Sequence, residues 1–194
     1  MVEAVARPKA SPIRALVYVW ATAGVLLLLG QGLLKLAPMA AQAIRGPLSP
    51  LQSAILWGFV VVNLYLEGYR GFQLRFVPRV VARALHLART REMSGWIVAA
   101  APLFAMGFFH AQRRARRAAW ILSSLIALAV LLIRHLPQPW RGVIDAGVVA
   151  GLGYGTVNFV YQALVAAFTG TARASAELPD DDATEHAAAV HPSR

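Results

Sequence analysis

Three polar side chains share one face of an otherwise apolar stretch. Asn63, Glu67 and Arg70 are spaced four and three residues apart, which places them on one side of a helix. A carboxylate there could bind a proton or a cation, because ionisable groups inside a membrane mark ion and substrate pathways. The alternative is structural: sixteen residues of helix after Leu51 rise about 24 Å, so Glu67 would pair with Arg70 near the membrane surface. We favour the structural interpretation.

A second pattern combines glycines with side-chain amides. Gly147, Gly151 and Gly155 repeat every four residues, and Asn158 and Gln162 continue the same stripe. Small residues at this spacing let two helix backbones approach closely, and amides can hydrogen-bond across the contact. We therefore predict that this stripe packs against another helix, either of the same chain or of a second copy.

Two further residues could take part in chemistry at the ends of apolar segments. His110 directly precedes a cluster of arginines, and its imidazole could carry a proton. We expect it instead to be a hydrogen-bond donor at the membrane surface. Asp145 lies near the start of the last apolar segment, where a helix dipole favours a carboxylate. We predict that Asp145 caps that helix.

The motifs of common enzyme classes are missing from the sequence. It has no cysteine, and its five histidines show no HxxxH or HExxH spacing, so we predict no metal site. Ser123 and Ser124 lie outside any GxSxG motif. Gly151, Gly153 and Gly155 lack the glycine pattern of a dinucleotide-binding turn. We therefore predict no cofactor and favour a role other than that of an enzyme.

The composition explains why these polar residues stand out. Of the 194 residues, 58% are hydrophobic and 14% are charged, the mean hydropathy is +0.54 and the net charge is +10. Soluble domains average about 45–50% apolar and about 25% charged residues. The composition thus predicts an all-α, polytopic helical membrane protein. Its apolar runs do not alternate with period two, which excludes an outer-membrane barrel.

Apolar stretches divide the chain into one helical membrane domain, about residues 15–170, between two polar ends. Residues 1–14 are expected to be a cytoplasmic segment, and residues 171–194 a disordered acidic tail. Because a spanning helix needs about 20 apolar residues, we predict four to five membrane-embedded helices, at about 15–36, 51–70, 95–112, 116–134 and 142–169. The first starts like a signal peptide, but its apolar run is too long for one, so we expect it to stay uncleaved.

The path of residues 95–112 stays open at this stage, because the segment is short and carries Pro102 in its middle. If the segment crosses the membrane, the arginines before and after it lie on opposite sides. If it returns, nearly all basic residues lie on one side, which fits the rule that basic loops stay in the cytoplasm. We therefore expect a cytoplasmic N-terminus.

The spacing of apolar residues over 77–91 predicts an amphipathic helix that lies in the membrane interface. Apolar positions recur at helical spacing, and Arg75, Arg79 and Arg83 form a second stripe. Such arginines meet anionic lipid headgroups, each contributing about 1 kcal/mol near the surface. The same is expected of the cluster Arg113, Arg114, Arg116 and Arg117. A pI of about 11.2 would also suit nucleic-acid binding, but we predict no nucleic acid, because the basic residues cluster beside apolar segments.

Three short stretches stand out as a set. They are Glu67-Gly68-Tyr69-Arg70-Gly71-Phe72-Gln73, Phe108-Phe109-His110-Ala111, and Leu136-Pro137-Gln138-Pro139-Trp140-Arg141-Gly142 followed by Asp145-Ala146-Gly147. Together they resemble an uncharacterised family of bacterial multi-pass inner-membrane proteins, over about residues 65–155. The resemblance implies a multi-pass protein of the bacterial inner membrane and carries no activity and no functional residue.

Three functions remain in competition. The first, which we favour, is a non-catalytic scaffold or accessory subunit that packs through Gly147, Gly151 and Gly155, with a membrane-protein partner or as a homo-oligomer. The second is a small transporter or channel subunit that uses Glu67 and Asn63. The third is a lipid-modifying enzyme in which the arginine clusters hold phosphate and Glu67 or His110 acts as acid or base. The third requires Glu67 and His110 to meet in one pocket.

Overall fold

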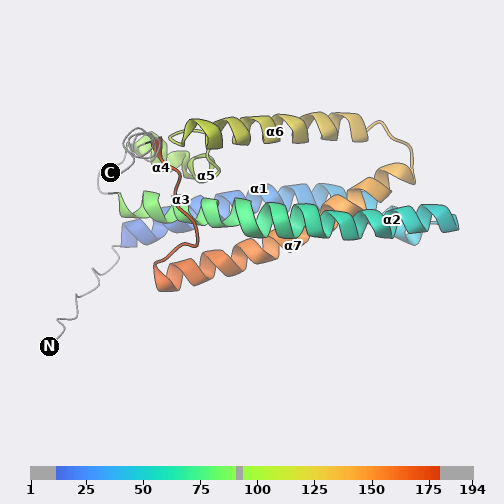
Figure 1. Cartoon of the computed structure of the whole chain (residues 1–194), viewed down its shortest axis with the longest axis horizontal. Coiled ribbons are helices and arrows are strands. Elements are labelled where there is room, and N and C mark those ends of the chain that lie inside the picture. Colours follow the sequence, from blue (N-terminus) through green and yellow to red (C-terminus); the bar gives the residue numbers. More distant parts are fainter. Residues whose placement is uncertain (1–11, 91–93, 180–194) are drawn as a thin grey trace, which may run out of the picture.

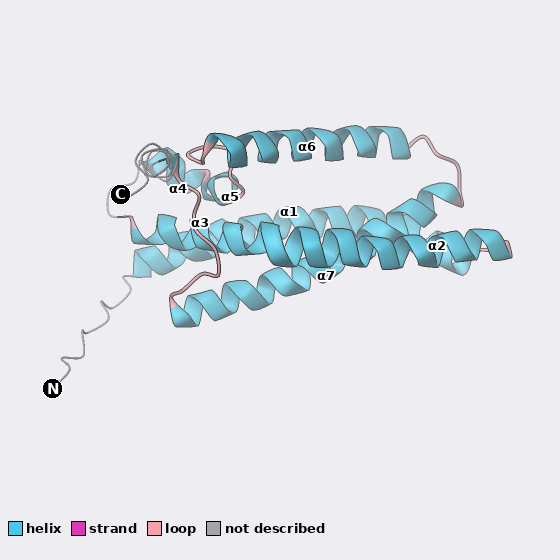
Figure 2. Cartoon of the chain, viewed as in Figure 1, coloured by secondary structure: helices cyan, strands magenta, loops and turns pink. Residues whose placement is uncertain are grey.

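The described residues of the computed structural model, 12–90 and 94–179, form helices and no strand (Figure 1, Figure 2). Four helices are long and apolar enough to cross a membrane. They are α1 (Pro12–Arg45), the continuous helix Pro50–Arg89, α6 (Arg113–Ile133) and α7 (Trp140–Thr169). The predicted all-helical fold class is therefore confirmed, and the predicted residues 1–14 lie mostly outside the described part of the chain.

The second long helix consists of three segments that follow one another without a break. These are α2 (Pro50–Asn63), the π-helix η1 (Leu64–Phe76) and α3 (Val77–Arg89). Its start is set locally by a capping box: the Gln52 amide donates to Ser49 Oγ at 3.2 Å, and the Ser49 amide donates to Gln52 Oε1 at 2.9 Å. Pro50 follows as the first helical residue, where its missing N–H costs nothing.

The π-helix lets this long helix continue through a proline. Pro78 has no amide hydrogen, and its ring would clash with a carbonyl in a regular α-helix. In the wider winding before it, the Val77 amide donates to the Phe72 carbonyl, five residues back. As a result α3 extends the second span and packs on α1, α5 and α7. The sequence predicted a separate helix at 77–91. The structure instead joins this helix to the second span, with Val77, Val80 and Val81 buried.

Residues 95–112 form two short helices and then reverse direction. α4 (Gly95–Ala99) and α5 (Ala101–Ala105) are separated at Ala100, next to Pro102. The chain then turns at Gly107 and His110, whose φ angles are +87° and +48°. Figure 1 shows α6 beginning at the end of the bundle where α3 finishes. The two ends of residues 95–112 therefore lie at the same end of the bundle, which is the geometry expected of the returning path.

α7 lies at the centre of the bundle and contacts α1, η1 and α2. A hydrophobic core at one end joins residues 17–25 of α1, 77–88 of α3, 101–105 of α5 and 159–166 of α7. A smaller core at the other end contains Ala40, Leu56 and Val143. Between these two cores lies the stripe of glycines and amides on α7. α6 stands apart, with none of its residues buried.

Candidate functional site

The glycine stripe of α7 packs against the second long helix of the same chain. A Cβ atom on Gly147 would overlap the Phe59 ring, and one on Gly155 would overlap the Phe72 ring. A Cβ atom on Gly151 would lie 3.0 Å from both the Asn63 carbonyl oxygen and Glu67 Oε2. Only glycine permits this close approach, so the predicted helix-packing face is occupied within the chain. We call this contact the α7–η1 seam.

Side-chain amides close the seam on the side of the larger core. Gln162, 5% exposed, donates from Nε2 to Asn158 Oδ1 at 2.6 Å and to the Gln73 carbonyl at 3.2 Å. The Tyr154 hydroxyl donates to Gln73 Oε1. These bonds satisfy polar groups that would otherwise be costly in an apolar interior. Gln73 thus belongs to the seam, although its sequence spacing from Asn158 and Gln162 offered no signal for it.

Glu67 lies within the seam, half-buried beside Gly151, and near the middle of the long helix Pro50–Arg89. Within the described part of the chain, ion pairs join Arg79 to Glu177 and Arg141 to Asp145, and none joins Glu67 to Arg70 as the sequence suggested. The reason is geometric. A π-helix has more residues per turn than an α-helix, so residues three apart point in more divergent directions. Nearby, Asn63 Nδ2 donates to the Phe59 carbonyl at 2.9 Å.

Asp145 lies one turn inside α7, because that helix begins at Trp140 and not at residue 142. It therefore does not cap the helix as predicted. Its carboxylate is 2% exposed and lies 3.7 Å from Arg141 Nε. Neither Arg141 Nε nor Asp145 Oδ2 has a hydrogen-bond partner. The pair is a structural contact at the smaller core.

Arg83 is buried and donates hydrogen bonds from all three of its guanidinium nitrogens, although the sequence placed it on an exposed stripe. It is 3% exposed, and its guanidinium lies 4.4 Å from the centre of the Phe104 ring. It donates to the carbonyls of Phe104 at 2.7 Å, Ala176 at 2.9 Å, and Phe109 and His110 at 3.0 Å each. Arg83 thereby holds together α3, the chain reversal and the segment after α7. It does not face lipid headgroups.

His110 lies at this chain reversal, with its ring near those of Trp96, Phe104 and Phe109. Arg83, whose guanidinium donates to the His110 carbonyl, is sixteen residues from Glu67 along one continuous helix, a rise of about 20–24 Å. Glu67 and His110 therefore do not meet. This separates the acid–base pair that the lipid-enzyme hypothesis required.

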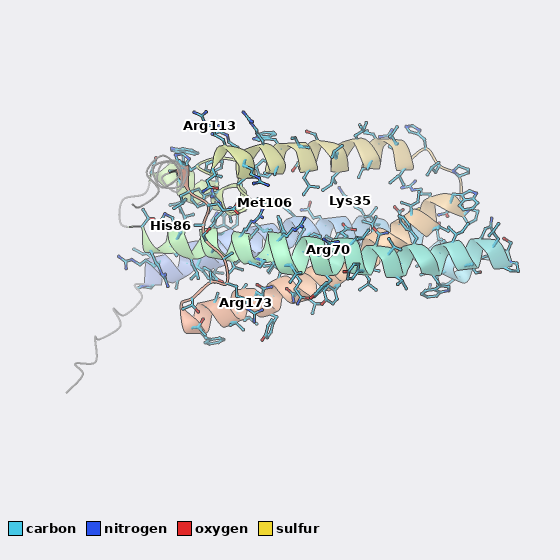
Figure 3. The ribbon with its side chains drawn as sticks, in the orientation of Figure 1. Lys35, Arg70, His86, Met106, Arg113 and Arg173 are labelled. Atoms are coloured by element: carbon cyan, nitrogen blue, oxygen red, sulfur yellow. The ribbon has the colours of Figure 1, made fainter. Side chains whose placement is uncertain are left out.

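Most of the predicted headgroup-binding arginines gather at one end of the bundle. This arginine-rich end comprises Arg14, Arg79, Arg83, Arg89, Arg113, Arg114, Arg116, Arg117 and Arg173, where α1 begins, α3 and α7 end, and α6 begins (Figure 1). Figure 3 shows Arg113 and Arg173 there, whereas Lys35 and Arg70 lie toward the middle. Arg75 is exposed on η1, four residues before Arg79. The opposite end carries Arg45, Arg134 and Arg141.

Two hollows are lined by residues other than Glu67, His110 and Asn158. One, of about 520 Å³, is open and lies beside residues 38–46 of α1. The other, of about 100 Å³, lies between α3, the end of α7 and residues 171–173. Among the described residues, no group of three histidine or acidic side chains could hold a metal ion. The chain matches no protein-family model, no curated protein and no solved structure.

Proposed function

We propose that this chain is a bacterial inner-membrane protein with four spanning helices and a cytoplasmic N-terminus. The arginine-rich end supports this orientation, because basic residues beside spanning helices stay in the cytoplasm. Residues 95–112 are then a cytoplasmic-side hairpin and not a fifth span. The resemblance of residues 65–155 to multi-pass inner-membrane proteins agrees with this topology.

The role we propose is that of a non-catalytic scaffold or accessory subunit. One observation carries it: the glycines and amides of α7, the richest polar pattern in the sequence, bind the chain's own second span. They join two helices firmly, as a structural core does. Because the face of Gly147, Gly151 and Gly155 is occupied within the chain, a membrane-protein partner or further copies of the chain would bind another surface in this proposal, and anionic lipid headgroups would bind the arginine-rich end.

A second candidate function rests on Glu67. Its carboxylate is half-buried in the seam, beside Asn63, and it lies in a π-helix, a winding that is frequent at functional sites. A carboxylate at this depth suits a transporter or channel subunit that moves protons or cations. The two functions differ in whether Glu67 must ionise during activity.

Ion flux in proteoliposomes separates the two functions. The full chain is reconstituted with a pH-sensitive dye inside, and a potassium gradient with valinomycin drives protons inward. A scaffold leaves the rate equal to that of empty liposomes, and Glu67→Gln changes nothing. A transporter gives a faster rate that Glu67→Gln abolishes, whereas Glu177→Gln, the same substitution outside the seam, does not. A Glu67-dependent flux overturns the scaffold proposal.

A further inference from the structure

The smaller of the two hollows has walls of two kinds. It lies between α3, the end of α7 and residues 171–173, and its volume is about 100 Å³. We call it the α3–α7 hollow. Its apolar lining residues are Val81, Val165, Ala166 and Ala172, and its polar or charged ones are Tyr161, Gln162, Thr171 and Arg173. The hollow has room for several water molecules or for a group of similar size, so it suits a small polar group that is attached to an apolar body.

Gln162 is the buried polar residue of the hollow, with 5% of its surface exposed. In the described part of the chain, both hydrogen bonds of its side chain are donated by Nε2. One goes to the Gln73 carbonyl, which only accepts, so the nitrogen and the oxygen of this amide cannot be exchanged. The amide oxygen is therefore left for another donor. A ligand hydroxyl in the hollow would satisfy it.

Arg173 gives the hollow a positive charge. Its side chain is exposed, and Figure 3 places it beside the end of α7. Arg89 is close to the hollow as well, because its guanidinium donates to the carbonyl of Gly170, which directly precedes the lining segment. Among the described residues, the acidic side chain at this end is Glu177, and it pairs with Arg79. Because arginine binds phosphate through pairs of N–H donors, the hollow favours a phosphate group.

An exposed apolar stripe on α7 runs past the hollow toward the middle of that helix. It consists of Val157, Tyr161, Leu164 and Phe168, which are spaced four, three and four residues apart and are each more than half exposed. Tyr161 also lines the hollow. In the proposed membrane location this face meets acyl chains, and tyrosine favours the level at which chains and headgroups meet. A lipid whose headgroup enters the hollow therefore finds an apolar surface for its chains directly beside it.

We propose that the α3–α7 hollow binds the headgroup of an anionic phospholipid that carries a hydroxyl group, the chemistry of phosphatidylglycerol. The phosphate lies against Arg173, the headgroup hydroxyl donates to the Gln162 side-chain oxygen, and the acyl chains follow the exposed stripe of α7. The inference rests on the proposed membrane location, and it assigns one site to the anionic headgroups that were proposed as partners of the arginine-rich end.

Native mass spectrometry of the full chain in neutral detergent measures which lipid the hollow retains. We expect phosphatidylglycerol to be retained at least about threefold more than phosphatidic acid, which has the phosphate but no headgroup hydroxyl, and about tenfold more than phosphatidylcholine. Equal retention of phosphatidylglycerol and phosphatidic acid overturns the hydroxyl contact and with it the proposal. Glycerol 3-phosphate at the same concentration should not displace the lipid. If it does, the ligand is a soluble phosphate ester and the lipid assignment is wrong.

Two matched pairs of variants test the hollow itself. Arg173→Gln should lower phosphatidylglycerol retention about three- to tenfold, whereas Arg117→Gln, the same substitution of an exposed arginine on α6, should change it less than about twofold. Val165→Phe fills the hollow, whereas Leu164→Phe changes an exposed neighbour outside its lining, so only the first should lower retention. Equal losses within each pair would mean that general charge and apolar surface hold the lipid, which overturns the proposal.

These measurements are independent of those that test the proposed function. Lipid retention in detergent does not require a particular orientation of the chain, which thiol labelling measures separately, and the scaffold role is tested by proton flux. If the topology or the scaffold role fails while Arg173→Gln still lowers retention, the lipid site stands. If retention is the same in all four variants while the topology holds, the lipid site alone is wrong.

Discussion

At the scale of single residues, the packing of the bundle depends on glycines where two helices meet and on hydrogen bonds to one buried arginine. The α7–η1 seam closes because Gly147, Gly151 and Gly155 have no Cβ atom. The larger core closes because Arg83 finds four carbonyls at once. Gly153 and Arg79 are nearby residues of the same types that lack these contacts, so they serve as matched controls.

Gly151→Leu should destabilise the protein by about 1–3 kcal/mol, because the new side chain must push the Asn63 backbone and Glu67 apart. Thermal unfolding in detergent measures the effect. Gly153 lies two residues away on α7 with open space around it, so Gly153→Leu should leave the midpoint almost unchanged. Equal midpoints for the two variants would mean that the seam is not tightly packed.

Arg83→Leu should cost about 3 kcal/mol or more, because four buried carbonyls lose their donor together. Arg79→Leu removes only an exposed ion pair and should cost less than about 1 kcal/mol. Denaturant titration of the two variants compares these costs. If Arg79→Leu were the more damaging substitution, the central role of Arg83 would be wrong.

At the scale of elements, the proposed four-span topology depends on the chain reversal after α5. It turns at Gly107, whose φ angle of +87° is open only to glycine without strain. No atom lies within 4 Å of a Cβ there, so Gly107→Ala tests conformation alone and should destabilise by about 1 kcal/mol. Gly58, in α2, also has open space, and Gly58→Ala should stabilise slightly. If Gly107→Ala and Gly58→Ala shifted the midpoint of thermal unfolding in the same direction, this account of the turn would be wrong.

The long apolar helices could be predicted from the sequence because lipid requires continuous apolar runs. The sequence does not predict that the second long helix continues through residues 64–78, because polar residues and Pro78 there indicate a break. The π-helix that accommodates these residues has no simple sequence signal. The burial of Arg83 was also missed. Its acceptors lie at residues 104–110 and 176, distant positions whose approach no local periodicity reveals.

Part of the candidate site could be predicted in the same way. The spacing of Gly147, Gly151 and Gly155 identified a face for close helix packing, since small residues every four positions line up on one side. Its partner could not be chosen, because a helix of the same chain and one of a second copy would leave the same pattern. The structure supplies Phe59, Asn63 and Phe72 from the same chain.

At the scale of the whole molecule, the exposed apolar surface of α6 is the feature that the proposed membrane location explains most directly. α6 is an apolar helix of 21 residues with no buried residue, and leucines, isoleucines and valines cover its surface. In water such a face would drive aggregation, whereas in the proposed topology lipid covers it. In that topology the arginine-rich end, the chain reversal and the segment that follows α7, residues 170–179, all lie on the cytoplasmic side.

Thiol labelling tests this topology most directly. Single cysteines at Ser94→Cys and Arg114→Cys flank the chain reversal, and Leu136→Cys lies between α6 and α7 at the opposite end. A membrane-impermeant maleimide added to spheroplasts should label Leu136→Cys and should reach the other two only after lysis. If Ser94→Cys and Arg114→Cys instead react from opposite sides, residues 95–112 cross the membrane and the four-span account is wrong.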